Sequence, residues 1–301
     1  MTLAARLRLT WLGVLAVATA LAASLLPETA PRGSACAIGI ATLFALAPLT
    51  LALEMIVGGI ADPRRPRPGI ARLRRVWWHE TLVTWRAFLW RQAFPRRDGP
   101  RLAPDPHRPA VLLIHGYLCN RAVWQPLLDA GVLRDCNVAA IDLEPVFADI
   151  DQYAEVVAAG LDRLLGASGA ARAVLVCHSM GGLAARAYLR RHGHARVARV
   201  ITLATPHHGT VFGRLGLGVN ARQMARGSRY LAALAEAEDD SLRTKFVCIA
   251  TRDDNLVVPR ASPLLPGATQ HLLEGVGHLA LIEDPRAWRL VAQEIRSIGG
   301  A

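Results

Sequence analysis

The segment between residues 172 and 192 constrains the fold of this chain more than any other. Residues 173–177 are a short apolar run rich in valine, as a buried parallel strand requires, and apolar residues recur at helical spacing after it. Ser179 lies on the sharp turn between strand and helix. A serine there takes a strained backbone conformation and needs small neighbours, and Gly181 and Gly182 meet that need.

The motif around Ser179 is C-H-S-M-G, whereas the usual turn of this kind reads G-x-S-x-G. The difference is Cys177, which is small and suited to apolar surroundings, so we interpret it as a tolerated variant. The alternative is a glycine-containing turn that follows a core strand and has no chemical role. The rest of the chain favours a reactive serine because it supplies the partners that such a serine needs.

Strand-like and helix-like segments alternate through the last two thirds of the chain. Strands are expected at 110–114, 138–141, 173–177, 197–203, 245–250 and 270–273, and helices at 121–128, 150–165, 181–191 and 285–298. Such alternation predicts a parallel sheet with right-handed crossovers and helices on its faces. We therefore expect one α/β domain over residues 108–301.

Two apolar runs precede this domain and predict two transmembrane helices within residues 1–61. Leu9–Leu26 carries no charge, and Ala35–Val57 carries only Glu54, with Pro48 as a kink that a spanning helix tolerates. The short connection between the runs favours a helical hairpin. A cleaved signal peptide is the alternative for the first run, because Ala20-Leu21-Ala22 fits a cleavage site.

Residues 62–107 are expected to join the hairpin to the domain. The stretch 62–75 is basic and rich in proline, which predicts a linker, and 96–108 predicts a second one. Between them, 76–94 holds four of the seven tryptophans, and Trp78, Leu82, Trp85 and Leu89 recur at helical spacing. Such a helix suits a membrane interface, and packing against the α/β domain is the equally weighted alternative.

The charge distribution, the cysteines and the absence of metal-binding motifs exclude several classes of function. The net charge is +11, but residues 1–97 hold 13 arginines and 4 acidic residues, so most of the basic character lies outside the domain and nucleic-acid binding is not expected. Five cysteines without a CxxC do not suggest a disulfide framework. No metal-ligand spacing such as HExxH is present, and we expect neither a metal nor a cofactor.

A reactive serine needs a base, an acid that orients the base, and donors for the developing oxyanion. His278 follows the last expected strand and is the candidate base, while Asp253 and Asp254 both end the preceding strand. The backbone N–H groups of Tyr117 and Met180 are the candidate oxyanion donors. The imidazole of His115 is expected to brace the same loop as Tyr117.

Five motifs together resemble the bacterial lipase/esterase branch of the α/β-hydrolase superfamily over about residues 108–299: HGY, CHSMGG, ATPHHGT, DNLVVP and GVGH. The resemblance implies the α/β-hydrolase fold. It implies Asp254 as the acid, because its spacing to Val257 fits the family better than that of Asp253. It also implies that Leu118, Pro206 and His207 border the substrate.

The resemblance further implies a serine hydrolase for carboxylic esters, most of all those of lipids. A thioesterase or amidase on the same residues is the enzymatic alternative, and a non-catalytic membrane interaction protein is the alternative of another class. Residues 210–241 are expected to form either a small mobile lid or an ordinary crossover. The arginines near the apolar runs predict a bacterial inner-membrane protein with a cytoplasmic domain. The sequence does not indicate an oligomeric state.

Overall fold

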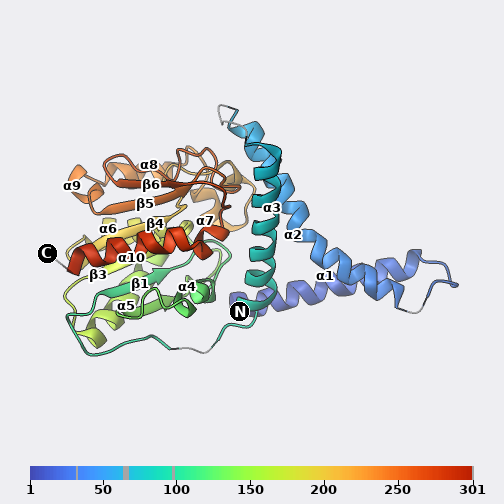
Figure 1. The fold of residues 1–301 in the computed structure, drawn as a ribbon, viewed down its shortest axis with the longest axis horizontal. Helices are drawn as coiled ribbons and strands as arrows, with labels where there is room; N and C mark the ends of the chain where they lie inside the picture. The colour runs from blue at the N-terminus through green and yellow to red at the C-terminus, as the bar shows by residue number, and fades with distance from the viewer. Residues whose placement is uncertain (32, 64–67, 97–98, 300–301) are drawn as a thin grey trace.

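The computed structural model describes residues 1–31, 33–63, 68–96 and 99–299. At its centre is a sheet of six parallel strands in the order β2-β1-β3-β4-β5-β6 (Figure 1). The strands are β1 (Ala110–Ile114), β2 (Asn137–Ile141), β3 (Ala173–His178), β4 (Val197–Leu203), β5 (Phe246–Thr251) and β6 (Thr269–Leu273). The predicted α/β sheet is confirmed, because all six expected strands are present and all pair in parallel.

Helices cover both faces of the sheet. One face carries α5 (Ile150–Ser168) and α6 (Met180–His192), and the other carries η2 (Arg121–Trp124), α4 (Gln125–Asp129) and α10 (Pro285–Gly299). Shorter helices follow β4 and β6: η3 (Val211–Arg214), α7 (Gly218–Gln223), α8 (Arg229–Glu236), α9 (Asp240–Arg243) and η4 (Ala280–Glu283). Every strand except β5 therefore runs into one or more helices, whereas the connection from β5 to β6 contains no helix.

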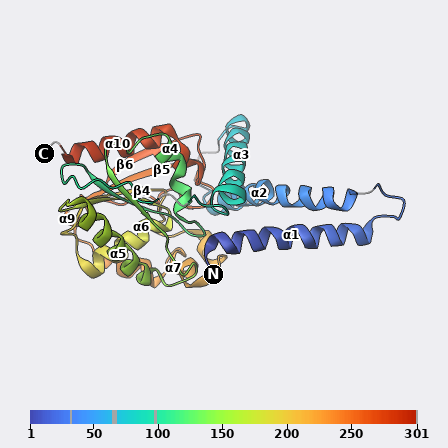
Figure 2. The ribbon, with the colours of Figure 1, turned by 90° about the horizontal axis from the view of Figure 1, so that it is seen from below.

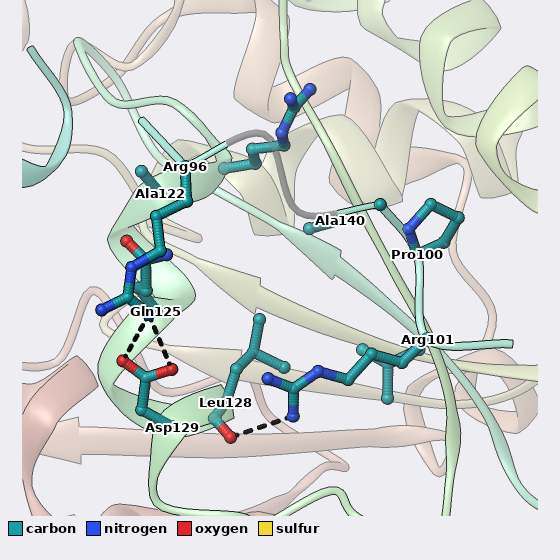
Figure 3. A pocket seen from close by; sticks show the side chains of 11 residues that line it. Arg96, Pro100, Arg101, Ala122, Gln125, Leu128, Asp129 and Ala140 are labelled. Carbon is teal, nitrogen blue, oxygen red and sulfur yellow. Dashed lines mark hydrogen bonds and ion pairs between the residues drawn. The ribbon is translucent and has the colours of Figure 1, made fainter. Parts of the chain in front are cut away.

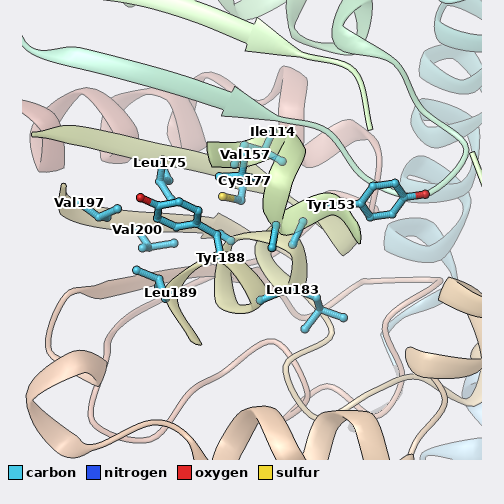
Figure 4. Close-up of a cluster of buried hydrophobic side chains, with 14 of the residues drawn as sticks. Ile114, Tyr153, Val157, Leu175, Cys177, Leu183, Tyr188, Leu189, Val197 and Val200 are labelled. Carbon is cyan, nitrogen blue, oxygen red and sulfur yellow. The ribbon is translucent and has the colours of Figure 1, made fainter. Parts of the chain in front are cut away.

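The central strands are apolar along their whole length because each face of the sheet is covered. In β3, Leu175 and Cys177 face α5 and α6, where they pack with Val157 and Tyr188 (Figure 4). Val174 and Val176 face the opposite layer. This two-sided burial fixes β3 at the centre of the sheet and holds the turn that follows it.

Two long apolar helices form a hairpin that projects from the domain, α1 (Leu3–Leu25) and α2 (Ser34–Ala61) (Figures 1 and 2). A Cβ atom on Gly39 would lie 2.3 Å from Thr19 Oγ1, so glycine there permits the close approach of the two helices. Both helices are long and apolar enough to cross a membrane.

Both ends of this hairpin contact the domain. The N–H of Leu3 donates to Glu144 Oε1 at 3.0 Å, and the guanidinium of Arg6 lies over the ring of Phe147. At the other end, Asn255 Nδ2 donates to Glu54 Oε2 at 2.6 Å. The chain thus leaves the domain and returns to the same side of it.

Pro48 lies inside α2, and one of two tryptophans that contact this helix compensates for the hydrogen bond that the proline removes. A proline has no N–H, so the carbonyl of Phe44, four residues earlier, loses its helical partner. Trp85 Nε1 donates to that carbonyl oxygen at 3.1 Å, and Trp77 Nε1 donates to the carbonyl of Pro48 at 2.9 Å. The kinked helix is therefore held by side chains from the next helical segment.

That segment comprises α3 (Ile70–Thr84) and η1 (Trp85–Arg91), a π-helical turn that continues it. The linker predicted over 62–75 is shorter than expected, because helical structure begins at Ile70. Val83 and Ala87 pack into the core of the domain while Trp78 and Trp90 stay exposed, so the segment has both a packed and an open face. The predictions that rest on Arg32, Arg64, Arg65 and Arg67 concern positions outside the described residues.

Candidate active site

The turn after β3 places Ser179 in a strained conformation. Its φ is 52° and its ψ is −125°, values that a non-glycine residue rarely adopts. A Cβ atom on Gly181 would lie 2.4 Å from the carbonyl oxygen of Ile114, and one on Gly182 would lie 2.2 Å from Thr205 Oγ1. Glycine is required at both positions because the end of β1 and the turn after β4 leave no room for a side chain.

Cys177 occupies the first position of the motif without conflict. Its side chain is fully buried in β3 among the apolar residues of the α5 and α6 layer. Burial raises the pKa of this thiol far above its usual value, so it is neutral and unreactive. A small apolar side chain is all that the position requires.

The loops after β5 and β6 bring Asp254 and His278 together. His278 Nδ1 lies 3.0 Å from Asp254 Oδ2 and 3.1 Å from Oδ1, and both side chains are buried. Asp254 Oδ1 also accepts the backbone N–H groups of Leu256 at 2.9 Å and Val257 at 2.7 Å. The carboxylate is thus fixed by its own loop while both of its oxygens face the imidazole.

The surroundings of His278 favour its protonated form. Burial alone would lower the pKa of the imidazole, but the charge and hydrogen bond of Asp254, with a further contribution from Glu80, raise the pKa above 6.5. The ring of His178 lies 4.8 Å from that of His278. Burial lowers the pKa of His178 well below 6.5, so this second ring is neutral.

Ser179 and His278 are walls of one cavity of about 400 Å³, which lies within the size range of small-molecule sites, roughly 300–1,000 Å³. Most of the other lining residues are apolar. Among the described residues, no hydrogen bond joins the side chains of Ser179 and His278.

The loop after β1 reaches the same cavity through Tyr117 and Leu118. Leu118 has a φ of 52°, so the chain turns sharply there. The hydroxyl of Tyr117 donates to the carbonyl of Leu217 at 2.8 Å and accepts its N–H at 2.9 Å. As the first residue of α6, Met180 has a backbone N–H without an intrahelical partner.

His115 braces this loop, as its position in the sequence indicates. Its Nε2 accepts the backbone N–H of Leu143 at 2.9 Å, which leaves Nδ1 to donate to the carbonyl of Gly116, also at 2.9 Å. Burial lowers the pKa of His115, in agreement with a neutral ring. The ring thus connects the loop after β1 to the loop after β2.

Asp253 has a different partner from Asp254. Its Oδ2 pairs with the guanidinium of Arg72 on α3 and accepts the N–H of Gly275 at 2.6 Å. The neighbouring acids therefore point apart, one toward α3 and the other toward His278. The spacing of the two aspartates in the sequence does not show that they have different partners.

Pro206 lines the cavity, but His207 does not, contrary to the expectation that it borders the substrate. The imidazole of His207 is buried beneath the turn, where its Nε2 lies 3.2 Å from Thr202 Oγ1 and 3.8 Å from Cys248 Sγ. His208 is directed away and pairs with the carbonyl of Leu264. The reason is that the turn points both rings away from the serine.

Glu80 is a buried residue at this site that the sequence analysis did not identify. Its carboxylate accepts the N–H groups of Leu279 at 2.6 Å and Ala280 at 2.9 Å, directly after His278. Burial raises its pKa to about 7. The sequence does contain a pattern that could identify Glu80. It lies four residues after Val76 and three before Val83, which places a carboxylate on the apolar, buried face of α3.

The region between β4 and β5 closes part of the cavity. Phe212, Leu215 and Met224 line it, and they belong to the segment predicted as a lid or crossover. Leu215 and Leu217 are 75% and 68% exposed. Apolar side chains therefore continue from the cavity to the outer surface of this segment.

A second pocket, of about 250 Å³, lies beside β2 and α4, away from Ser179 (Figure 3). Its charged groups are already paired, since Arg96 contacts Asp129 at 3.0 Å and Arg101 donates to the carbonyl of Leu128 at 3.1 Å. This pocket lies between the segment that enters the domain and the helices η2 and α4, and its paired charges do not indicate a binding site.

A parallel six-stranded sheet with a strained serine on the turn after β3 is the α/β-hydrolase fold. Residues 111–246 match the model of the alpha/beta hydrolase family. The match runs from β1 to the first residue of β5. It includes Ser179 and ends before Asp254 and His278.

Solved structures are similar to this chain at low sequence identity. The mature form of the lipase BlEst2 from Bacillus licheniformis is 20% identical, with a TM-score of 0.57 over 64% of this chain and 94% of the lipase. Its propeptide form has the same identity and TM-score over 65% of this chain and 52% of that one. An esterase from Thermogutta terrifontis is 21% identical, with a TM-score of 0.46 over 64% and 90%.

No curated protein sequence matches the chain. At about 20% identity, the likeness to BlEst2 shows the fold and does not identify the substrate.

Proposed function

We propose that this protein is a membrane-anchored serine hydrolase that cleaves carboxylic esters of lipids. The observation that carries the proposal is the convergence of Ser179, on its strained turn, with the buried Asp254–His278 pair on one apolar cavity. The three groups have the chemical roles of nucleophile, orienting acid and base.

In the proposed reaction, the Ser179 hydroxyl rotates toward His278 Nε2 and attacks the ester carbonyl while the imidazole accepts its proton. Asp254 stabilises the imidazolium, and the N–H groups of Tyr117 and Met180 donate to the oxyanion. His278 then gives its proton to the leaving alcohol, which leaves an acyl group on Ser179. Water hydrolyses that acyl-enzyme with the same imidazole as base.

An apolar cavity and an apolar surface around it support a lipid ester as the substrate. Exposed aromatic side chains lie close to the point where the hairpin meets the domain, among them Trp78, Trp90 and Phe94. Tryptophan is enriched at membrane interfaces, where its ring is apolar and its N–H remains polar. The proposal therefore places the mouth of the cavity at the membrane surface.

The position of the two hairpin ends supports a cytoplasmic domain at the inner membrane of a bacterium. Both ends dock on the domain, so the N-terminus and the domain lie on one side. Arg6, Arg8, Arg72 and Arg86 are on that side, which the positive-inside bias assigns to the cytoplasm. Packing of α1 on both α2 and the domain also argues for an uncleaved first helix.

The test of the proposed function compares the wild-type chain with Ser179→Ala in hydrolysis of nitrophenyl esters and triglycerides. Loss of the nucleophile is expected to reduce kcat by about 10³-fold or more. Circular dichroism and the melting temperature serve as controls for folding. Equal hydrolysis by the two proteins would contradict the assignment.

A further inference from the structure

The α/β domain does not enclose the catalytic cavity alone. Thr50, Leu51 and Glu54 of α2 and Phe88 of η1 line it together with Ser179. Leu51 is only 5% exposed, although it belongs to one of the two apolar helices of the hairpin. A segment that looks like a membrane anchor in the sequence is therefore also a wall of the site.

The contact between α2 and the domain is specific. Leu51, Glu54 and Gly58 recur at intervals of three and four residues, so they share one face of the helix. Glu54 accepts the hydrogen bond from Asn255, and a Cβ atom on Gly58 would lie 3.3 Å from Val258 Cγ2. This face of α2 is therefore fixed against the loop that follows β5.

The same helix continues into the projecting hairpin. In the projecting hairpin α2 packs along α1 (Figure 2), whereas Thr50, Leu51 and Glu54, which follow Pro48, line the cavity. Leu49 and Leu53, on the outer face of α2 after Pro48, are 66% and 60% exposed. An acyl chain bound beside Ser179 therefore meets Leu51, whereas Leu49 and Leu53 do not line the cavity.

We propose that α2 and η1 form the acyl-chain wall of the cavity, with Leu51 and Phe88 as the residues that determine chain-length specificity for an amphiphilic ester. This inference rests on the proposed hydrolase function, since the chain is bound relative to Ser179 as the nucleophile. The anchor then takes part in substrate selection as well as attachment.

The test uses the full chain in detergent and measures kcat/KM for 4-nitrophenyl acetate, octanoate and palmitate. Leu51→Trp fills the cavity, and Leu53→Trp is the matched control with the same side chain on the outer face. We expect Leu51→Trp to lower the palmitate-to-acetate ratio of kcat/KM by about tenfold or more, and Leu53→Trp to keep it within about twofold of wild type.

Leu51→Ala removes atoms instead of adding them, and it is expected to raise the palmitate-to-octanoate ratio. A fluorophosphonate that labels each variant reports an intact nucleophile. Unchanged ratios in both Leu51 variants, or the same change in the Leu53 control, would overturn the inference while ester hydrolysis by the wild type still supports the proposed function. A wild-type chain that hydrolyses none of the three esters would overturn both.

Discussion

Asp254→Asn should abolish the proposed ester hydrolysis by forcing the wrong tautomer on His278. In the carboxylate, Oδ1 accepts two backbone N–H groups, from Leu256 and Val257, and lies 3.1 Å from His278 Nδ1, while Oδ2 lies 3.0 Å from the same nitrogen. An asparagine amide has only one acceptor oxygen, and the two N–H donors hold it at the Oδ1 position. Its NH₂ group then faces Nδ1.

An imidazole that accepts at Nδ1 carries its proton on Nε2 and cannot take the serine proton. We therefore expect kcat to fall by about 10⁴-fold, the loss known for an asparagine in place of a triad aspartate. KM should change little, because Asp254 does not line the cavity among the described residues. Steady-state kinetics with a nitrophenyl ester measures both quantities.

Asp253→Asn is the matched control in the adjacent position. It weakens the pairing with Arg72 on α3, so we expect it to lower the free energy of unfolding by about 1–2 kcal/mol and to leave kcat within about tenfold. Chemical denaturation measures the first effect. Equal losses of kcat in the two variants, or a larger loss for Asp253→Asn, would refute the assignment of the acid.

Three further predictions concern pH, the kinked helix and the membrane. The acidic limb of the pH profile of kcat/KM should lie above pH 6.5, because Asp254 and Glu80 raise the pKa of His278 against the effect of burial and only the neutral ring accepts a proton. Glu80→Gln should move this limb to lower pH, and a limb that does not move would contradict the role of the Glu80 charge. Trp85→Phe should lower the free energy of unfolding by about 1–3 kcal/mol, and by less in a Pro48→Ala background, where the N–H of residue 48 donates to the Phe44 carbonyl. A double-mutant cycle measured by melting curves that shows no coupling would argue against this contact. Reporter fusions at Ala301 should give a fluorescent cytoplasmic reporter and inactive alkaline phosphatase, and the reverse pattern would refute the proposed topology.

The strands of the sheet could be predicted because each one is marked by a short stretch of neighbouring residues. Each central strand is buried on both faces, so it appears as a short apolar run, and the two glycines after Ser179 mark the turn where β3 meets α6. The same reasoning from local sequence gave a wrong prediction for residues 70–75. Six residues with three arginines suggest a linker, but Arg72 is held by Asp253 and Glu274 across the structure, which stabilises the start of α3.

The N-terminal contribution to the site could not be derived from local patterns. Glu54 and Glu80 reach the loops that carry Asp254 and His278 from about 200 residues away in sequence, and the position of those helices depends on tertiary packing. His207 illustrates the opposite case. Its motif resembles a substrate-bordering turn, yet the backbone of that turn directs the ring into the core.

The most direct test of the central claim is to locate covalent modification by a fluorophosphonate. The reagent reacts with a serine that is activated by a neighbouring base and held near oxyanion donors. Peptide mass spectrometry of the labelled full-length protein should find the adduct on Ser179, and Ser179→Ala should take up no label. An adduct on another residue, or equal labelling of the alanine variant, would contradict the account.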